Sequence, residues 1–310
     1  MSLCFRPDGT FTIAQFTDLH WQNGEPEDLR TTALMGRVLD EEHPDLAVLT
    51  GDVIAGSGCQ HPAESLRRAV APLVERGLPW ALVFGNHDDE GTLDRRGLLD
   101  VALGCPGCLA DPGPAGVSGV GNYVAQVQSQ DGGAGAALYF LDSRSYALTD
   151  VGGYGWIARD QIDWYEQAAQ RVPRRNGVTA PALAFLHIPL PEFNEVWDSQ
   201  PCRGVKYEEV CCPKVNSGFF AALHEAGEVV GVFAGHDHVN DYEGTLHGVR
   251  LCYGRATGYH TYGRDGMPRG ARLIRLTHGA RAFHTWLRLD DGSVVAPQPE
   301  HAPQGRALPR

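Results

Sequence analysis

The sequence predicts an α/β fold with a largely parallel sheet, and two observations support this. Short apolar runs rich in strand-forming residues, each ending in a polar residue, occur at 11–18, 45–52 and 79–86. Segments whose apolar residues recur at helical spacing separate these runs, at 27–42 and 63–77. A β-α-β-α-β order implies right-handed crossovers, which make the strands parallel and cover both faces of the sheet with helices.

The same alternation continues along the chain. Three more apolar runs predict strands: residues 136–142, 181–189 and 229–238. Two amphipathic segments predict the helices between them: residues 159–171 and 216–227. Three later strand-like runs have no helix between them, and predict an antiparallel edge or a second sheet: residues 249–254, 271–277 and 282–289. Long loops are expected at residues 103–121 and 189–214.

The chain contains no internal repeat and no linker long enough to divide it. We therefore expect one domain over residues 1–290. The last twenty residues, 291–310, contain four prolines and little to bury, so we expect a flexible tail there.

Charge and hydropathy exclude several classes of partner. The formal net charge of -12 disfavours nonspecific binding to nucleic acid or to an anionic membrane. No apolar run reaches the roughly 18 residues that a membrane span requires, so we expect a water-soluble protein. The first residues lack the pattern of a signal peptide, but a leader could be missing, so a cytoplasmic and an exported location both remain open.

The eight cysteines leave two questions open. Cys105 and Cys108 form a single CxxC, whereas a zinc site of this type needs a second pair. Cys202, Cys211 and Cys212 crowd one polar segment, where they either form a disulfide or remain free thiols.

The ends of the expected strands carry the candidate chemistry. In open α/β sheets, ligands bind outside the carboxyl ends of the strands. Here those ends carry Asp18 with His20, Asp52, Asn86 with His87, His187, and His236 with His238. A lone aspartate at a strand end is usually a helix cap or turn residue, and a lone histidine is usually a core residue. Five strand ends that all finish in nitrogen or oxygen ligands predict a metal site.

The number and type of these ligands predict two metal ions. Seven side chains are too many for one tetrahedral zinc but suit two ions that share a bridging carboxylate: Asp18, His20, Asp52, Asn86, His187, His236 and His238. Imidazole, carboxylate and amide ligands favour Mn, Fe or Zn over Ca or Mg. The sequence does not choose among the three.

The charge of such a centre predicts its substrate class. Two divalent ions, two aspartates and a bridging hydroxide sum to about +1, so the site attracts anions. A hydroxide held between two ions can attack a phosphoryl group whose oxygens the ions hold, which predicts phosphoester hydrolysis. His87 would hydrogen-bond the phosphate or protonate the leaving group. Asp88 would orient that imidazole or cap the next helix, and Asp89 and Glu90 are expected to cap.

Together, D-L-H at Asp18, G-D at Asp52, G-N-H-D at Asn86, the strand-end His187 and G-H-D-H at His236 resemble the signature of the calcineurin-like metallophosphoesterase superfamily. The resemblance implies a four-layer α-β-β-α sandwich with two mixed sheets, and His87 as the catalytic imidazole. It also implies a ligand assignment: Asp18, His20 and His238 on one ion, Asn86, His187 and His236 on the other, and Asp52 bridging.

A narrower resemblance extends to about Thr277. The stretches 83–91, 185–193, 215–220, 235–242 and 251–263 resemble the small purple-acid-phosphatase-like proteins of plants, fungi and bacteria. True purple acid phosphatases have glycine in place of His20 and a metal-bound tyrosine in place of Ala55, so the iron(III) colour is not expected here. The same regions suggest substrate contacts, although surface or packing roles stay open for each residue: Asn216, Asn240, Tyr259, His260 and Arg264.

We therefore expect a dinuclear metallophosphoesterase that hydrolyses a phosphomonoester, either a phosphorylated small molecule or a phosphoprotein. Two alternatives stay open. One is a phosphodiesterase that acts on a cyclic nucleotide or a similar substrate. The other is a binding scaffold of the same fold that no longer catalyses, although such scaffolds usually lose ligands that this chain retains.

Overall fold

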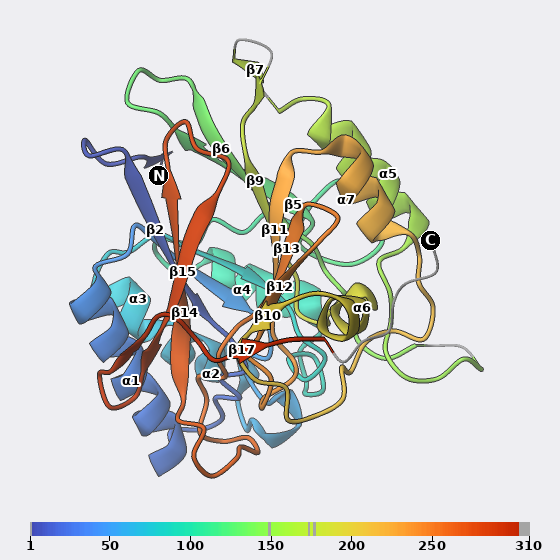
Figure 1. The fold of residues 1–310 in the computed structure, drawn as a ribbon. Coiled ribbons are helices and arrows are strands. Elements are labelled where there is room, and N and C mark those ends of the chain that lie inside the picture. The colour runs from blue at the N-terminus through green and yellow to red at the C-terminus, as the bar shows by residue number, and fades with distance from the viewer. Residues whose placement is uncertain (1, 148–149, 173, 176–177, 304–310) are drawn as a thin grey trace.

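The computed structural model of the chain describes residues 2–147, 150–172, 174–175 and 178–303, and it contains two sheets packed between helices (Figure 1). The six-stranded sheet has the order β16 (Val294–Val295), β15 (Phe283–Leu289), β14 (Gly270–Thr277), β2 (Thr10–Phe16), β3 (Leu46–Thr50) and β4 (Trp80–Val83). Its strands β2, β3 and β4 are parallel, as predicted, whereas β14 runs antiparallel to the other edge of β2.

The nine-stranded sheet has the order β1 (Leu3–Cys4), β5 (Tyr123–Gln128), β6 (Ala134–Phe140), β9 (Ala182–Phe185), β11 (Val229–Ala234), β13 (Val249–Tyr253), β12 (Glu243–Leu246), β10 (Cys202–Arg203) and β17 (Glu300–His301). Strands β6, β9, β11 and β13 are parallel, and β12 and β10 add antiparallel pairs. A separate pair joins β7 (Arg174–Arg175) and β8 (Val178–Thr179). The predicted α/β class with two mixed sheets is therefore confirmed.

Helices cover the outer faces of both sheets. The six-stranded sheet is accompanied by α1 (Pro26–Glu42), α2 (Pro62–Ala69), α3 (Ala71–Glu75) and α4 (Arg95–Leu103). The nine-stranded sheet is covered by α5 (Arg159–Ala169) and α7 (Phe219–Ala226), while α6 (Glu192–Ser199) lies beside β12. The single helix expected at 63–77 is two helices, because Pro72 has no N–H to continue the hydrogen bonding of α2. Among the described residues, none of the helices is both long and apolar enough to cross a membrane.

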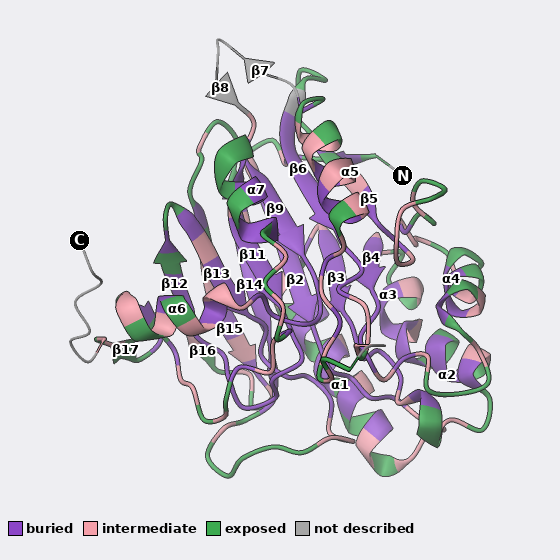
Figure 2. Cartoon of the chain, turned by 90° about the vertical axis from the view of Figure 1, so that its right-hand side faces the viewer, coloured by how far each residue is buried: buried purple, intermediate pink, exposed green. Residues whose placement is uncertain are grey.

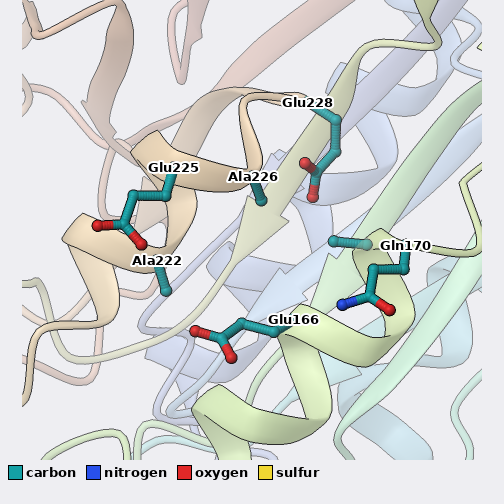
Figure 3. Close-up of a pocket in the computed structure, with 7 residues that line it drawn as sticks. Glu166, Gln170, Ala222, Glu225, Ala226 and Glu228 are labelled. Carbon is teal, nitrogen blue, oxygen red and sulfur yellow. The ribbon is translucent and has the colours of Figure 1, made fainter.

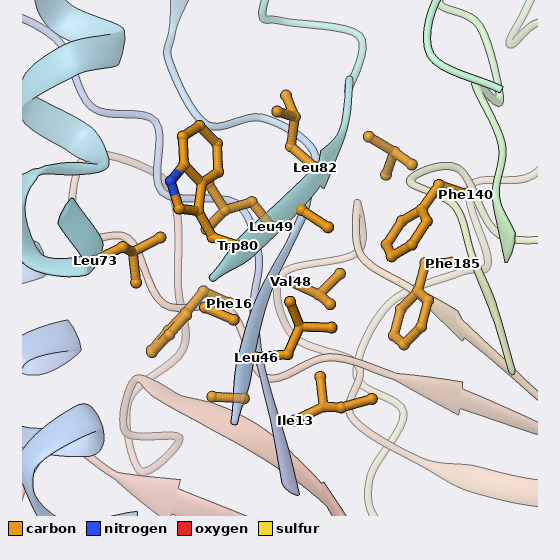
Figure 4. Close-up of a cluster of buried hydrophobic side chains, with 14 of the residues drawn as sticks. Ile13, Phe16, Leu46, Val48, Leu49, Leu73, Trp80, Leu82, Phe140 and Phe185 are labelled. Atoms are coloured by element: carbon orange, nitrogen blue, oxygen red, sulfur yellow. The ribbon is translucent and has the colours of Figure 1, made fainter. Parts of the chain in front are cut away.

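The core lies on both faces of each sheet. Alternate residues of β6 point to opposite sides, so that Leu138 and Phe140 pack between the sheets while Tyr139 packs against the α5 and α7 layer. The ring of Phe140 stacks on Phe185 with centroids 5.3 Å apart, opposite aliphatic side chains of β2 and β3 (Figure 4). Figure 2 shows that buried residues are concentrated on the strands and exposed residues on helices and loops. The buried sheets form a rigid base for the loops at the strand ends.

The expectation of a flexible tail from residue 291 is wrong for its first part. Strand β16 pairs with β15, and β17 pairs with β10. The side chain of Gln298 is buried and accepts a hydrogen bond from Arg272 Nη2 at 3.1 Å. These short strands are held by backbone pairing, which composition does not reveal. Residues 304–310 lie outside the described part of the chain.

The expected loop at 189–214 likewise contains α6 and β10. All eight cysteines lie within the described residues and are free thiols, so Cys202, Cys211 and Cys212 form no disulfide in this structure.

Candidate metal centre

The polar residues at the strand ends converge between the two sheets. Asp18 and His20 follow β2, Asp52 follows β3, and Asn86 follows β4, all in the six-stranded sheet. The nine-stranded sheet contributes His187 after β9, and His236 and His238 after β11. Each of these seven side chains is at most 7% exposed. Both sheets are therefore needed to complete the group.

The seven side chains form two groups that share Asp52. Asp18, His20, Asp52 and His238 place one ligand atom each within 4.8 Å of one another, and so do Asp52, His187 and His236. The shared Oδ2 atom of Asp52 lies 3.4 Å from Nε2 of His20 and 3.3 Å from Nε2 of His187. Asp52 is therefore positioned to bridge.

The remaining distances complete both groups. In the first group, Nε2 of His238 lies 3.4 Å from Oδ1 of Asp18. In the second, Nε2 of His187 lies 3.2 Å from Nδ1 of His236 and 3.1 Å from Oδ1 of Asn86. Nitrogen and oxygen ligands about 2.0–2.2 Å from one ion stand roughly 3 Å apart, so this spacing suits coordination.

Three buried atoms of the predicted ligands have no hydrogen-bond partner among the described residues: Nε2 of His20, Nε2 of His236 and Oδ2 of Asp52. Leaving a buried polar atom unpaired costs about 1–3 kcal/mol. A cation between Nε2 of His20 and Oδ2 of Asp52, which lie 3.4 Å apart, would remove that cost for these two atoms, because each carries a lone pair that a metal accepts. The donor set therefore fits two metal ions that share Asp52.

Neighbouring groups orient the imidazoles. Nδ1 of His187 donates to the carbonyl oxygen of Thr50 at 2.8 Å, and Nδ1 of His238 lies 2.6 Å from Oγ1 of Thr261. Such contacts fix the tautomer and leave Nε2 free to bind a metal. Thr17 donates to the Asp18 carboxylate at 2.8 Å and holds it in place.

The electrostatics of the group favour cation binding. Burial raises the pKa of Asp18, but the nearby His238 outweighs it and brings the pKa down to about 2. Burial opposes the charge on Asp52 as well, yet His187 holds its pKa well below the usual value. Burial lowers the pKa of His20 to about 4 and of His236 to about 3. At neutral pH the centre thus combines two carboxylates with neutral His20 and His236. Burial lowers the pKa of His187, but the charge of Asp52 outweighs it and raises the pKa to about 9, so a cation bound there would displace that proton.

Four of the predicted ligands have left-handed backbone conformations: Asp18 (φ 54°), His20 (φ 47°), Asp52 (φ 48°) and His236 (φ 78°). This conformation costs roughly 1–2 kcal/mol for a residue other than glycine. Backbone strain of this kind clusters at functional sites, where the surrounding structure maintains it. It turns the side chains back from the strand ends toward one centre.

Glycines before the ligands make room for the neighbouring motif. A Cβ atom on Gly51 would lie 2.4 Å from Nδ1 of His187, and one on Gly85 would lie 2.1 Å from Oδ1 of Asp52. A Cβ on Gly235 would lie 1.9 Å from Oγ1 of Thr17. The G-D, G-N-H and G-H-D-H motifs thus need glycine so that their loops can pack against one another.

His87 lies at the edge of the centre. Its ring centroid is 5.3 Å from that of His20, and its side chain is 38% exposed. Nδ1 of His87 lies 2.8 Å from Oε2 of Glu90, which leaves Nε2 available to a bound molecule. Burial lowers the pKa of His87, but the charges of Asp52 and Glu90 outweigh it and raise the pKa above its usual value. Protonated His87 can therefore donate a proton near the centre.

The roles expected for the three acidic residues after His87 are wrong. Asp88 neither contacts the imidazole nor caps a helix: Oδ1 accepts from the N–H of Ile54 at 2.9 Å and Oδ2 from that of Gly85 at 2.7 Å. It joins the G-D and G-N-H loops instead. Glu90 is the residue that orients His87. Asp89 pairs with Arg95 at 3.2 Å, and the cap of α4 is Asp94.

The five residues with weakly suggested substrate roles all make other contacts. Asn240 is completely buried and accepts from the N–H of Tyr207 at 2.9 Å, so the expectation that it contacts substrate is wrong. The others pair as follows: Asn216 with Glu192 (2.6 Å), Tyr259 with Asp290 (2.6 Å), His260 with Asp28 (3.5 Å), and Arg264 over the ring of Tyr207 (4.3 Å). For these four, substrate contact stays a prediction.

Three tyrosines that sequence reasoning did not identify surround the ligands. The hydroxyl of Tyr146 accepts from Nδ2 of Asn86 at 3.2 Å and donates to Glu90 at 3.3 Å. The ring of Tyr154 meets that of His236 edge-on, with centroids 4.4 Å apart, and the ring centroids of Tyr262 and His238 are 4.2 Å apart. Tyr146 and Tyr262 are about half exposed, at 46% and 54%. They give the mouth of the centre an aromatic rim.

Two cavities differ in their relation to this centre. One of about 430 Å³ is lined in part by Asn86, Glu90 and Tyr146. The other, of about 410 Å³, lies between α5 and α7 and contains none of the predicted site residues (Figure 3). Its lining includes three glutamates, Glu166, Glu225 and Glu228, whose charges would repel a phosphate.

The two-sheet sandwich and its shared Asp52 define the class of dimetal phosphoesterases. Residues 11–240 match the family model described as calcineurin-like phosphoesterase, and the chain belongs to that family.

Named relatives agree with this membership, and a solved structure shares the fold. The chain is 37% identical over 333 residues to the protein named probable inactive purple acid phosphatase 14 of Arabidopsis thaliana, covering 93% of this chain and 83% of the relative. It is 35% identical to phosphatase DCR2 of Saccharomyces cerevisiae, covering 91% of this chain and 54% of that protein. A dimetal phosphatase from Danio rerio shares the fold at a TM-score of 0.57 and 15% identity, covering 89% of this chain and 98% of that one.

Proposed function

We propose that this protein is an active dinuclear metal-dependent phosphomonoesterase. The observation that carries the proposal is the complete set of seven buried side chains, in which two groups share Asp52, together with His87 at the edge of the centre. When bound, two ions of Mn, Fe or Zn would activate water and polarise the phosphoryl oxygens. The substrate would be a phosphorylated small molecule or a phosphoprotein.

The chain's own residues supply the rest of the chemistry. Nε2 of His87 donates a hydrogen bond to the phosphate or a proton to the departing oxygen, while Glu90 holds Nδ1 and favours the protonated form. The amide of Asn86 adds a ligand without adding negative charge, which preserves the attraction for an anion. Several relatives carry names that include "probable inactive". The intact ligand set and the oriented His87 support activity in this chain.

The test combines metal analysis with a small panel of esters. Purified protein would be loaded with Mn, Fe or Zn and assayed on p-nitrophenyl phosphate and on bis(p-nitrophenyl) phosphate. We expect hydrolysis of the monoester and a loss of about 10²–10⁴-fold in kcat for His87→Ala. His61→Ala is the matched control, because His61 is exposed at the start of α2 and makes no side-chain cap hydrogen bond.

Two outcomes would overturn the proposal in different ways. A large preference for the bis-ester would make the protein a phosphodiesterase. Metal-loaded protein that is inert on every ester would instead favour a binding scaffold. A His87→Ala variant as active as the wild type would show that His87 is not the catalytic imidazole.

A further inference from the structure

The cavity of about 430 Å³ beside Asn86 is lined by a positively charged side chain, Arg144, that the proposed chemistry does not use. Its lining combines Asn86, Glu90 and Tyr146 with two arginines, Arg95 and Arg144. Asn86 belongs both to the metal group and to the wall of the cavity. A group attached to a phosphate at the metals can therefore extend past Asn86 into this space.

The carboxylates that line the cavity already have partners. Asp142 pairs with Arg95 and accepts from the backbone N–H groups of Val120 and Arg144, each at 2.7 Å. Arg95 also pairs with Asp89 at 3.2 Å. The third lining carboxylate, Glu90, contacts His87 and Tyr146 as described above.

The guanidinium of Arg144 is different. Within the part of the chain that the structure describes, it makes no hydrogen bond or ion pair, although the residue is half-buried. Its backbone has a φ of 70°, a conformation that arginine rarely adopts. The hydrogen bond from its N–H to Asp142 stabilises this conformation. A Cβ on Gly155 would come within 2.9 Å of Cβ of Arg144, so the chain also closes tightly around this residue.

We propose that Arg144 binds a second acidic group of the substrate, beyond the phosphate that is cleaved. The inference rests on the proposed function, because the metals and His87 hold the reacting phosphate and leave Arg144 for another anion. Arginine forms strong charge-assisted hydrogen bonds with carboxylates and phosphates. The exposed ring of Tyr146 provides a surface for the body of the leaving group. The preferred substrate class is thus a phosphomonoester whose alcohol part carries an acidic group.

Binding of two matched phosphonates to the metal-loaded protein tests this assignment without requiring turnover. The ligands are 4-(carboxymethyl)benzylphosphonate and 4-ethylbenzylphosphonate, which differ in the carboxylate and are both stable to hydrolysis. Calorimetry of the wild type should show about tenfold tighter binding of the carboxylated ligand, as expected for one charge-assisted contact.

Variants at Arg144 separate its charge from its backbone. Arg144→Asn should bind the two phosphonates equally, because asparagine tolerates a positive φ but carries no charge. Arg144→Lys should retain part of the preference. Arg96→Asn is the matched control and should behave like the wild type, since Arg96 is exposed on α4 and does not line the cavity.

The outcomes distinguish this inference from the proposed function. Loss of the preference in Arg144→Asn supports the inference even if the wild type hydrolyses no ester, in which case only the proposed function fails. Equal binding of both phosphonates by the wild type overturns the inference even if hydrolysis is observed. An equal weakening of both ligands in Arg144→Asn also overturns it, because Arg144 would then hold the phosphate itself.

Discussion

Replacing Gly85 by alanine tests whether the loop packing described above positions the bridging carboxylate. The new Cβ would lie 2.1 Å from Oδ1 and 2.4 Å from the backbone nitrogen of Asp52. Non-bonded carbon atoms stand about 3.5–4.0 Å apart, so Asp52 or the Gly85 loop must move by roughly 1 Å or more. The same Oδ1 accepts from the N–H of His87 at 2.8 Å, so that residue is displaced as well.

The cost of this displacement can be estimated. Overpacking costs about 1–3 kcal/mol, and each kcal/mol lowers the Tm of a large domain by about 2–4 °C. We therefore expect Gly85→Ala to lower Tm by roughly 2–12 °C. Disturbing the groups that support a metal ligand commonly costs about 10–100-fold in metal affinity, so we expect at least one ion to be lost on dialysis.

The assay is elemental analysis of dialysed protein, combined with thermal unfolding and hydrolysis of p-nitrophenyl phosphate. Gly36→Ala in α1 is the control, because its Cβ would meet only the end of the Arg76 side chain, at 3.3 Å. That change should leave Tm unchanged or raise it, since alanine favours the helix by roughly 0.5–1 kcal/mol over glycine. Two bound ions per chain, an unchanged Tm and unchanged kcat in Gly85→Ala would refute the reasoning.

Three further predictions concern charge at the centre. Glu90→Gln removes a charge that raises the pKa of His87, so that pKa falls and the protonated imidazole is lost at lower pH. The basic limb of the pH–rate profile should therefore move to lower pH with KM little changed. If the limb does not move, Glu90 does not set the pKa of His87. Asn86→Asp adds a negative charge next to Asp52, so KM and the inhibition constant of phosphate should both rise roughly tenfold; unchanged constants would count against an anionic substrate. Removal of metals by a chelator should lower Tm reversibly, because ions at about 100 times their Kd stabilise the folded state by about 2.7 kcal/mol. A Tm that is the same with and without metals would contradict the proposed metal site.

The parts that sequence predicts well are those that follow from strand geometry. Parallel strands bring their carboxyl ends to one edge, so apolar runs that end in Asp18, Asp52 and Asn86 already place these residues together. The structure adds that the strand ends of the nine-stranded sheet meet those of the six-stranded sheet, which brings His187, His236 and His238 to the same place.

Local spacing alone does not reveal how loop residues are used. Glu90 stands close to a helix start, where a carboxylate usually caps, and only the turn around His87 shows that it binds the imidazole. Arg144 and Tyr146 lie in a loop without a recognisable motif, so nothing in the sequence marks them. Short elements such as β16 and β17 were missed because two-residue strands have no periodicity to detect.

The pairing of β14 with β2 determines how far the chain can be shortened. The family match ends at residue 240, yet β14 covers one edge of the strand that leads to Asp18. The N–H of Gly258 also donates to the carbonyl oxygen of Asp18 at 3.1 Å. A fragment cut at residue 240 would expose a bare strand edge, which invites aggregation, and would release the first ligand loop. Efforts to transplant or miniaturise this centre should therefore retain the chain at least through β15.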